Sequence, residues 1–278
     1  MMSGFGLYYS LNKGFDWRSY LKKRFLRVFP DYFIAVCFAT VVYKYNIGTF
    51  ITQLTTLDFW LENKITFWFI SLIAVLYVLF PIIYRMINRS RLTVVLMFAG
   101  LIILFICLEL FAKDYYCNRL IAFDRIFIFI IGGVLGKASC DKKQITNTMV
   151  CLLFLIGLAL GMVVLLISIP HYRLLYITLA VSLSFVFCKS MTFTSLKHIK
   201  TIFTWLGALS LDIYLFHELI LRLNNTILAD DRVSDWVRII ITTVITVLVS
   251  ILINSLSINT RRRMKNICPN VAKIILHK

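Results

Sequence analysis

One apolar stretch, residues 205–221 (WLGALSLDIYLFHELIL), contains several side chains that can do acid–base or hydrogen-bonding chemistry. On an α-helix, Ser210, Tyr214 and His217 share one face, whereas Asp212 falls on another side. An ionisable group at membrane depth costs about 2.5–3.5 kcal/mol and usually faces a bundle interior or a wet cavity. The stretch therefore predicts one wall of a site. The alternative is a packing helix whose polar atoms bond to neighbouring helices.

A second candidate site is the basic stretch 12–27 (NKGFDWRSYLKKRFLR). Arg24 and Arg27 are three residues apart, so they share one face of a helix and suit a phosphorylated ligand. Basic residues interleaved with aromatic ones are also typical of a cytoplasmic loop that sets topology and touches anionic lipid. The spacing alone favours the loop.

A third candidate is the acid–base pair Asp124 and Arg125, at the mouth of the apolar run 121–136. The pair is consistent with a membrane-interface ion pair and equally with a contribution to a site. The sequence leaves these two interpretations open.

The elements that position these residues follow from composition. Of the 278 residues, 60% are hydrophobic, and the mean hydropathy is +0.85, which no soluble domain requires. The apolar runs approach the ~20 residues that cross a bilayer, and they are too continuous for the alternating strands of a barrel. We therefore predict an all-α fold, a polytopic transmembrane helical bundle that forms one domain over residues 1–278.

The apolar runs predict eight spans. These are 26–43, 66–84, 92–111, 121–136, 148–169, 173–188, 203–221 and 236–258. Residues 44–64 are predicted to be a polar loop. Residues 1–11 are apolar but too short to cross a membrane, and they look like the interior of a helix.

The net charge of +17 reflects membrane topology and not nucleic-acid binding, because the basic residues lie between the apolar runs. Most of the 30 Lys and Arg residues fall in alternate loops, which the positive-inside rule places in the cytoplasm. Both ends of the chain, including the basic tail 259–278, are then cytoplasmic.

Several chemistries are not indicated. The seven cysteines form no CxxC pair and have no histidine at zinc spacing, so neither a metal site nor a disulfide framework is expected. There is no P-loop, GxSxG elbow or HExxH motif. The residues alone allow a membrane enzyme or a proton-coupled transporter of a polar or lipid-linked solute.

Three stretches in order resemble the acyltransferase 3 family of integral membrane O-acyltransferases. The first joins Ser3–Phe5 to an Arg-x-x-Arg-x-x-Pro-x-Tyr pattern within 22–36. The second is 67–83, which is similar to the family's Leu-Trp-Phe-Leu-Ser run and includes Trp68. The third is 206–221, which resembles Leu-Gly-x-x-Ser-x-x-Ile-Tyr-Leu-x-His. The matched residues of the third are Leu206, Gly207, Ser210, Ile213, Tyr214, Leu215 and His217.

The resemblance implies a reaction. Family members move an acyl group, usually acetyl, from cytoplasmic acyl-CoA to a hydroxyl of a cell-envelope carbohydrate or lipid-linked glycan, with no bound cofactor. Arg24 and Arg27 fall at the arginine motif implicated in handling the donor, and CoA phosphates suit bidentate arginines. Trp68, Ser210, Asp212, Tyr214 and His217 are then site-lining candidates. The family fits a bacterial inner membrane.

The resemblance also implies a departure. The family has ten spans, and its catalytic histidine and an upstream arginine lie on a first span with no counterpart here. No catalytic residue is therefore assigned, and we expect this chain to be truncated at its N-terminus or to start at a misassigned codon. Its own activity is then in question, and a non-catalytic remnant is a further alternative. Asp212 stands where a small polar residue such as Ser is common in the family.

Overall fold

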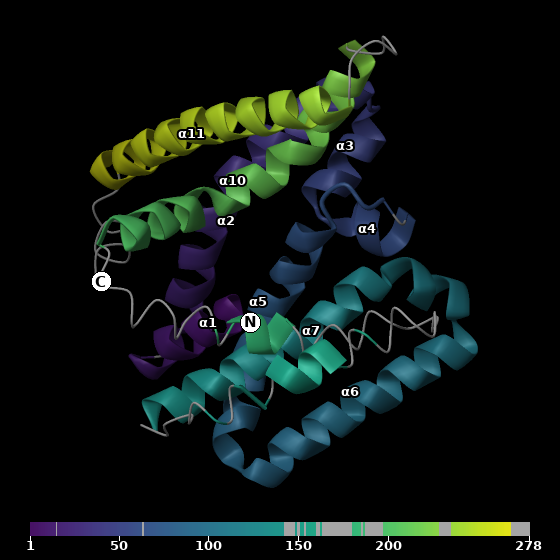
Figure 1. Ribbon diagram of the computed structural model, residues 1–278, viewed down its shortest axis with the longest axis vertical. Helices are drawn as coiled ribbons and strands as arrows, with labels where there is room; N and C mark the ends of the chain where they lie inside the picture. The colour runs from purple at the N-terminus through teal and green to yellow at the C-terminus, as the bar shows by residue number, and fades with distance from the viewer. Residues whose placement is uncertain are drawn as a thin grey trace. The chain divides into compact units, whose positions relative to one another are not determined.

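The computed structural model describes residues 1–141 except 15 and 63, then 148, 151–152, 154–159, 162, 180–184 and 186, and finally 197–227 and 235–267. In these ranges the chain forms helices joined by short turns, without a strand (Figure 1). The all-α prediction is confirmed.

Five of the described helices are long and apolar enough to cross a membrane, so the prediction of a helical membrane protein is confirmed. They correspond to the predicted spans at 26–43, 66–84, 92–111, 203–221 and 236–258. The five are Trp17–Tyr43, Trp68–Arg89, Arg91–Phe111, His198–Asn224 and Trp236–Leu256.

The other three predicted spans have different outcomes. Residues 121–136 lie in a long helix, α7 (Lys113–Cys140), but this helix is not among the five because charged residues interrupt its apolar sequence. The predicted spans 148–169 and 173–188 fall mostly outside the described residues, as does the end of the basic tail. The count of eight spans stays a prediction.

The helices form two compact units that alternate along the chain. The first unit comprises Met1–Trp17 and Leu72–Ser195, and the second comprises Arg18–Ser71 and Leu196–Lys278. Helix α5 (Trp68–Arg89) begins in the second unit and continues in the first. That the whole chain is one domain stays a prediction.

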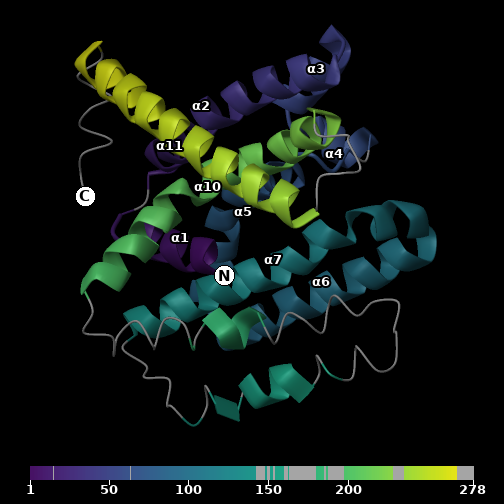
Figure 2. The same ribbon diagram turned by 45° about the horizontal axis from the view of Figure 1, so that its top comes forward.

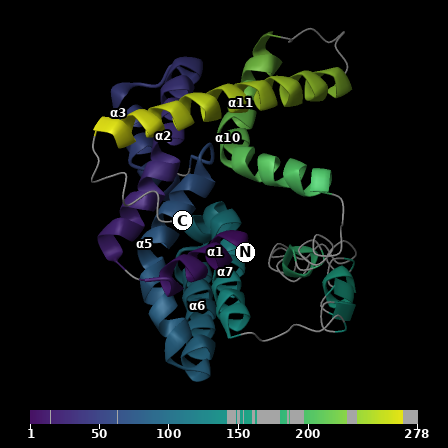
Figure 3. The same cartoon turned by 90° about the vertical axis from the view of Figure 1, so that its left-hand side faces the viewer.

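In the first unit, α6 (Arg91–Phe111) and α7 lie side by side (Figures 1 and 2), with α5 running beside them (Figure 3). The short helix α1 (Met2–Asn12) packs very closely on α7, since a Cβ at Gly4 would clash with the carbonyl of Phe129. Tyr8 fixes α1 to α5 by donating to Asn88 Oδ1 over 2.7 Å. The helical character predicted for residues 1–11 is confirmed.

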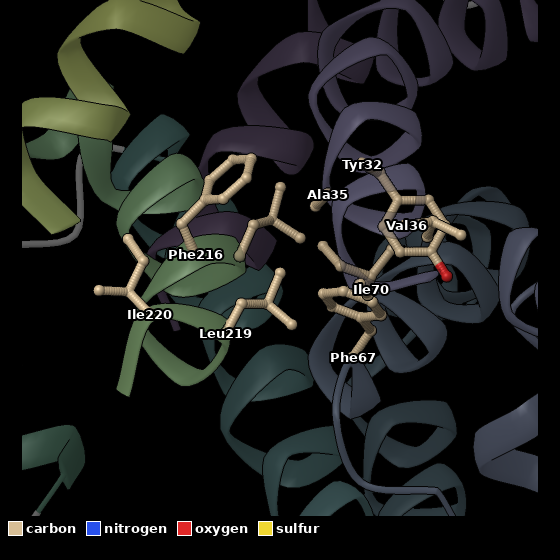
Figure 4. Packing of buried hydrophobic residues seen from close by; sticks show 10 residues of the cluster. Tyr32, Ala35, Val36, Phe67, Ile70, Phe216, Leu219 and Ile220 are labelled. Carbon is tan, nitrogen blue, oxygen red and sulfur yellow. The ribbon is translucent and has the colours of Figure 1, made fainter. Parts of the chain in front are cut away.

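In the second unit, α2 (Trp17–Tyr43) and α10 (Lys197–Ile227) share a buried core with the start of α5. Figure 4 shows Tyr32, Val36, Phe67 and Ile70 facing Phe216, Leu219 and Ile220 of α10. The small residues Ala35 and Ala39 are fully buried, which lets the helices approach closely, as small residues do in membranes. Helix α11 (Asp235–Ile267) packs along α10 (Figures 1 and 2).

Helix α2 begins earlier than the predicted span. It starts at Trp17 and takes in the basic stretch, because Leu, Lys and Arg are good helix formers. Pro30, predicted near the start of the span, therefore lies inside the helix, where it removes one backbone hydrogen bond. The result is one continuous helix with a basic first half and an apolar second half.

The prediction of a polar loop at 44–64 is wrong. This segment folds into a two-helix hairpin, with α3 at Ile47–Leu54 and α4 at Leu57–Glu62. Asn46 caps α3 by accepting the Thr49 N–H over 2.8 Å. The segment contains several large apolar residues at helical spacing. The loop prediction considered only its charged residues and so missed this pattern.

The distribution of apolar and polar side chains in the hairpin is the reverse of that in a helical hairpin of a water-soluble protein. Its exposed side chains are largely apolar, and its two fully buried polar side chains are Gln53 and Asp58. An outward apolar face suits the lipid interface, and the polar groups point to the protein interior. The exposed apolar residues are Ile47, Ile51, Leu57 and Leu61.

Candidate functional site

A group of polar side chains lies inside the second unit, where α2, α10 and the hairpin meet. We define the inner polar cluster as Tyr32, Gln53, Asp58 and Tyr214. The Tyr32 hydroxyl donates to the backbone carbonyl of Gln53 and so holds α3 against α2. Tyr32 is about three helical turns before the end of α2 at Tyr43, so the hairpin folds back along the helix.

Asp58 is the most unusual member of the cluster. Its side chain is 1% exposed, and neither carboxylate oxygen accepts a well-formed hydrogen bond from the described residues. Burial raises the pKa of Asp58 to about 6, an effect that the backbone N–H of Phe59 and the Lys64 ammonium only partly offset. The charge of Asp58 acts on both tyrosine hydroxyls, Tyr32 and Tyr214.

Gln53 adds a second unsatisfied group. Its side chain is 0% exposed, and neither its Nε2 nor its Oε1 has a hydrogen-bond partner among the described residues. A buried polar group without a partner costs about 1–3 kcal/mol, and native proteins rarely leave one so. Two such groups in one short hairpin indicate a place where a polar ligand completes the bonding.

Tyr214 and Trp68 are brought together by the fold. The Tyr214 hydroxyl accepts the backbone N–H of Phe69 over 3.0 Å, which satisfies one of the amides left open at the start of α5. The Trp68 ring meets the Tyr214 ring edge-on, with centroids 6.4 Å apart. These two predicted site-lining residues therefore adjoin the inner polar cluster.

Ser210 and His217 lie on the exposed side of α10. Ser210 Oγ donates to the Gly207 carbonyl over 2.9 Å within its own helix. His217 Nδ1 lies 2.7 Å from the Tyr214 carbonyl, within the same helix. These two predicted site-lining residues do not point into the cluster.

Asp212 occupies the opposite side of α10. It is 2% exposed and shares the buried face of the helix with Leu209 and Phe216. This is the side that packs into the core, so Asp212 is separated from the exposed His217 by the body of the helix.

Arg24 and Arg27 lie on the basic half of α2, the same helix that carries Tyr32. Arg24 is half-buried, with its guanidinium carbon 5.8 Å from the centre of the Tyr20 ring. Arg27 is exposed. One helix thus carries a cationic surface in its first half and a member of the inner polar cluster in its second half.

Two ion pairs lie near the cluster, one on α10 and one at the end of α4. Arg222 pairs with Glu218 over 3.2 Å and places its guanidinium 5.0 Å from the centre of the Tyr43 ring. Lys64 pairs with Glu62 over 2.6 Å.

Asp124 and Arg125, the third candidate of the sequence, point to different sides of α7. Asp124 is buried, whereas Arg125 is exposed. The buried arginine nearby is Arg119, whose guanidinium lies 3.9 Å from the centre of the Tyr115 ring and donates to the Tyr115 carbonyl over 3.3 Å. The two interpretations of Asp124 and Arg125, a membrane-interface ion pair or a contribution to a site, stay predictions.

Two further features bear on ligands. A shallow cavity of about 420 Å³ lies along the first turns of α10, lined by Lys200, Thr201, Thr204, Trp205 and Ala208. Within the described ranges, no three His, Cys, Asp or Glu side chains gather as they would around a metal ion.

Sequence reasoning missed Gln53 and Asp58. The signal that reveals them is the pattern of residues 47–61, in which Ile, Leu, Phe and Trp recur at helical spacing around these two polar positions. Polar residues that interrupt an amphipathic apolar segment are candidates for a buried site, whereas in a polar loop they attract no attention.

The fold and the cluster define a class: an integral membrane protein of transmembrane helices with ionisable groups inside one helical unit. The chain belongs to the acyltransferase 3 family, whose acyltransferase domain matches residues 1–255, most of the chain. No curated protein and no solved structure is significantly similar to it. The chain is therefore a membrane acyltransferase.

Proposed function

We propose that the protein transfers an acyl group, and specifically acetyl, from acyl-CoA to a hydroxyl of a cell-envelope carbohydrate. In this reaction the C–S bond of the thioester breaks and a C–O ester bond forms. The proton of the acceptor hydroxyl passes to the CoA thiolate. No resident cofactor takes part. We place the protein in a bacterial inner membrane, with both ends of the chain in the cytoplasm.

The observation that carries the proposal is the division of α2 into two functional halves. Arg24 and Arg27 provide two guanidinium groups on one face, which suits the phosphates of CoA. The second half contributes Tyr32 to the inner polar cluster, where hydroxyl groups can be bound. Arg27 and Tyr32 are five residues apart, about 7.5 Å along the helix axis, so α2 brings the arginine pair and the cluster onto neighbouring turns of one helix.

The test is CoA binding and acyl transfer by the protein in lipid nanodiscs. We expect CoA to raise the unfolding temperature, because a ligand of the native state stabilises it. Arg24→Ala with Arg27→Ala removes two charge-assisted contacts, each worth about 1.5–3 kcal/mol, and should weaken CoA binding at least a hundredfold.

The matched control is Arg18→Ala with Lys22→Ala. These residues lie on the other side of α2, four residues apart, and their loss removes the same charge. The control should bind CoA nearly as the unaltered protein does. Equal weakening by the two pairs would show a general charge effect, and unchanged binding in the Arg24 and Arg27 variant would refute the donor site. Solute-dependent proton movement without CoA binding would favour a transporter.

A further inference from the structure

The inner polar cluster presents hydrogen-bonding groups that match those of a ligand rich in hydroxyl groups. Asp58 presents two carboxylate oxygens that accept hydrogen bonds, and Gln53 presents one acceptor and one amide donor. The Gln53 atoms are buried without a partner among the described residues, and the Asp58 carboxylate receives only weak interactions from the backbone N–H groups of Asp58 and Phe59. Adjacent hydroxyls both donate and accept, so a polyol matches this set of groups.

The neighbouring tyrosines already make hydrogen bonds, which limits the donors and acceptors that they can offer a ligand. The Tyr32 hydroxyl already donates to the Gln53 carbonyl, and the Tyr214 hydroxyl already accepts the Phe69 N–H. The Tyr214 hydroxyl keeps its own proton to donate. The cluster therefore offers a ligand mainly acceptors from Asp58 and Gln53, with a tyrosine O–H and an amide N–H as donors.

The hairpin backbone is strained next to these residues. Thr56, between α3 and α4, has φ of 62°, and Lys44, before α3, has φ of 53°. The left-handed region is unfavourable for a β-branched residue such as Thr56. Such strain is concentrated at ligand-binding and switch segments, and here it sits at both ends of α3.

We propose that Asp58 and Gln53 bind adjacent hydroxyl groups of the acyl acceptor and so position the hydroxyl that is acylated. The inference rests on the proposed function. Asp58 acts as a positioning residue, because nothing places it in contact with the reacting thioester. Since both side chains are enclosed, the ligand reaches them when the hairpin moves away from α2.

The test uses the full chain in nanodiscs, with methyl β-glucopyranoside as a polyol probe and 2-methoxytetrahydropyran as a ring without hydroxyls. We expect the glucoside to raise the unfolding temperature and the ring without hydroxyls to leave it unchanged. Asp58→Leu should weaken the apparent affinity for the glucoside at least tenfold, the effect of losing one hydrogen bond to a charged group. Asp58→Asn should weaken it less.

Glu62→Leu is the matched control, because Glu62 is an exposed carboxylate one turn further along α4. It should keep the response to the glucoside. The inference is overturned if Asp58→Leu responds to the glucoside as the unaltered protein does, or if Glu62→Leu loses the response equally. An increase in unfolding temperature with sodium ions alone, abolished by Asp58→Leu, would also overturn it in favour of a cation site.

CoA binding separates this inference from the proposed function. If CoA stabilises both the unaltered protein and Asp58→Leu, the donor site stands and the glucoside result decides the acceptor site. If CoA stabilises neither while the glucoside response depends on Asp58, the proposed acyl transfer fails and the hydroxyl site stands. If Asp58→Leu unfolds at a lower temperature, Asp58 has a structural role and the inference fails.

Discussion

Two polar groupings in the second unit differ in one respect, the satisfaction of their hydrogen bonds. Between α10 and α11, the Asn224 amide donates to Thr242 Oγ1 over 2.8 Å and to the Arg238 carbonyl over 3.1 Å. In the hairpin, the side chains of Asp58 and Gln53 are more deeply buried than Asn224 but make no well-formed hydrogen bond with the described residues.

The difference teaches how to separate structural from functional polar residues in a membrane protein. Asn224 and Thr242 bond to each other, which is the usual way that polar side chains join transmembrane helices. Asp58 and Gln53 destabilise the native state as it stands, so their presence calls for an explanation outside packing.

The largest effect is the pH dependence that Asp58 contributes to stability. Its pKa is about 6 in the folded state and near 3.8 when exposed, so the folded state binds the proton more tightly. This contribution is fully present below pH 4 and is lost as the pH rises through 6. The loss is about 3 kcal/mol.

Asp58→Asn removes this titration. Its free energy of unfolding should therefore exceed that of the unaltered protein at pH 7 and approach it at pH 4, as measured by unfolding in nanodiscs across this range. The charged groups that face Asp58 are Lys64 and Glu62, and the Tyr32 and Tyr214 hydroxyls face it as titratable groups that are neutral across this pH range. Glu62→Gln serves as the control for loss of a carboxylate. Parallel pH curves for Asp58→Asn and the unaltered protein would contradict the buried charge.

The second effect has the opposite sign. Asn224→Leu should lower the free energy of unfolding by about 1–2 kcal/mol, because Thr242 and the Arg238 carbonyl lose their donor. Thr243→Val is the control, since the Thr243 hydroxyl donates to the Ile239 carbonyl of its own helix. If Asn224→Leu were as stable as the unaltered protein, hydrogen-bond satisfaction would not distinguish the two groupings.

A smaller effect is expected at the edge of the cluster. Tyr214→Phe removes the oxygen that accepts the Phe69 N–H and should lower the free energy of unfolding by about 1 kcal/mol. Tyr84→Phe is a suitable comparison, because its hydroxyl makes a long, exposed bond of 3.4 Å to Asn12. Equal unfolding temperatures for the two variants would show that Tyr214 does not hold the start of α5.

The smallest effect concerns the strained hairpin. Thr56→Asn should raise the free energy of unfolding by roughly 0.5–1 kcal/mol, because Asn tolerates the left-handed region better than a β-branched residue. Thr55→Asn is the control, since Thr55 has ordinary right-handed geometry. Equal gains at both positions would point to a cause other than backbone strain.

Much of the fold follows from the sequence because apolar length has a direct physical meaning in a bilayer. A run of about 20 apolar residues crosses a bilayer as a helix, because no water is present there to bond the backbone. Five of the predicted spans are helices long and apolar enough to do so. The hairpin at 47–62 was predicted wrongly because its helices are too short to span and its few charges suggested a loop.

Part of the candidate site was also foreseeable. Tyr214 and Trp68 were predicted as site-lining residues from two motifs far apart in the sequence, and the fold brings the edge of one ring against the face of the other. Ser210 and His217 share a helical face with Tyr214 by spacing, but spacing does not say which face packs inward. Burial in the folded unit places Asp212 inside and leaves His217 outside.

The sequence by itself determined the class of protein, its helical spans, its family and the paired arginines of α2. These depend on local composition and spacing, which a single chain states directly. Only the tertiary structure decided that Gln53 and Asp58 are buried beside Tyr32 and Tyr214. The physical reason is that desolvation and missing hydrogen bonds are properties of surroundings, and those surroundings come from segments distant in the chain.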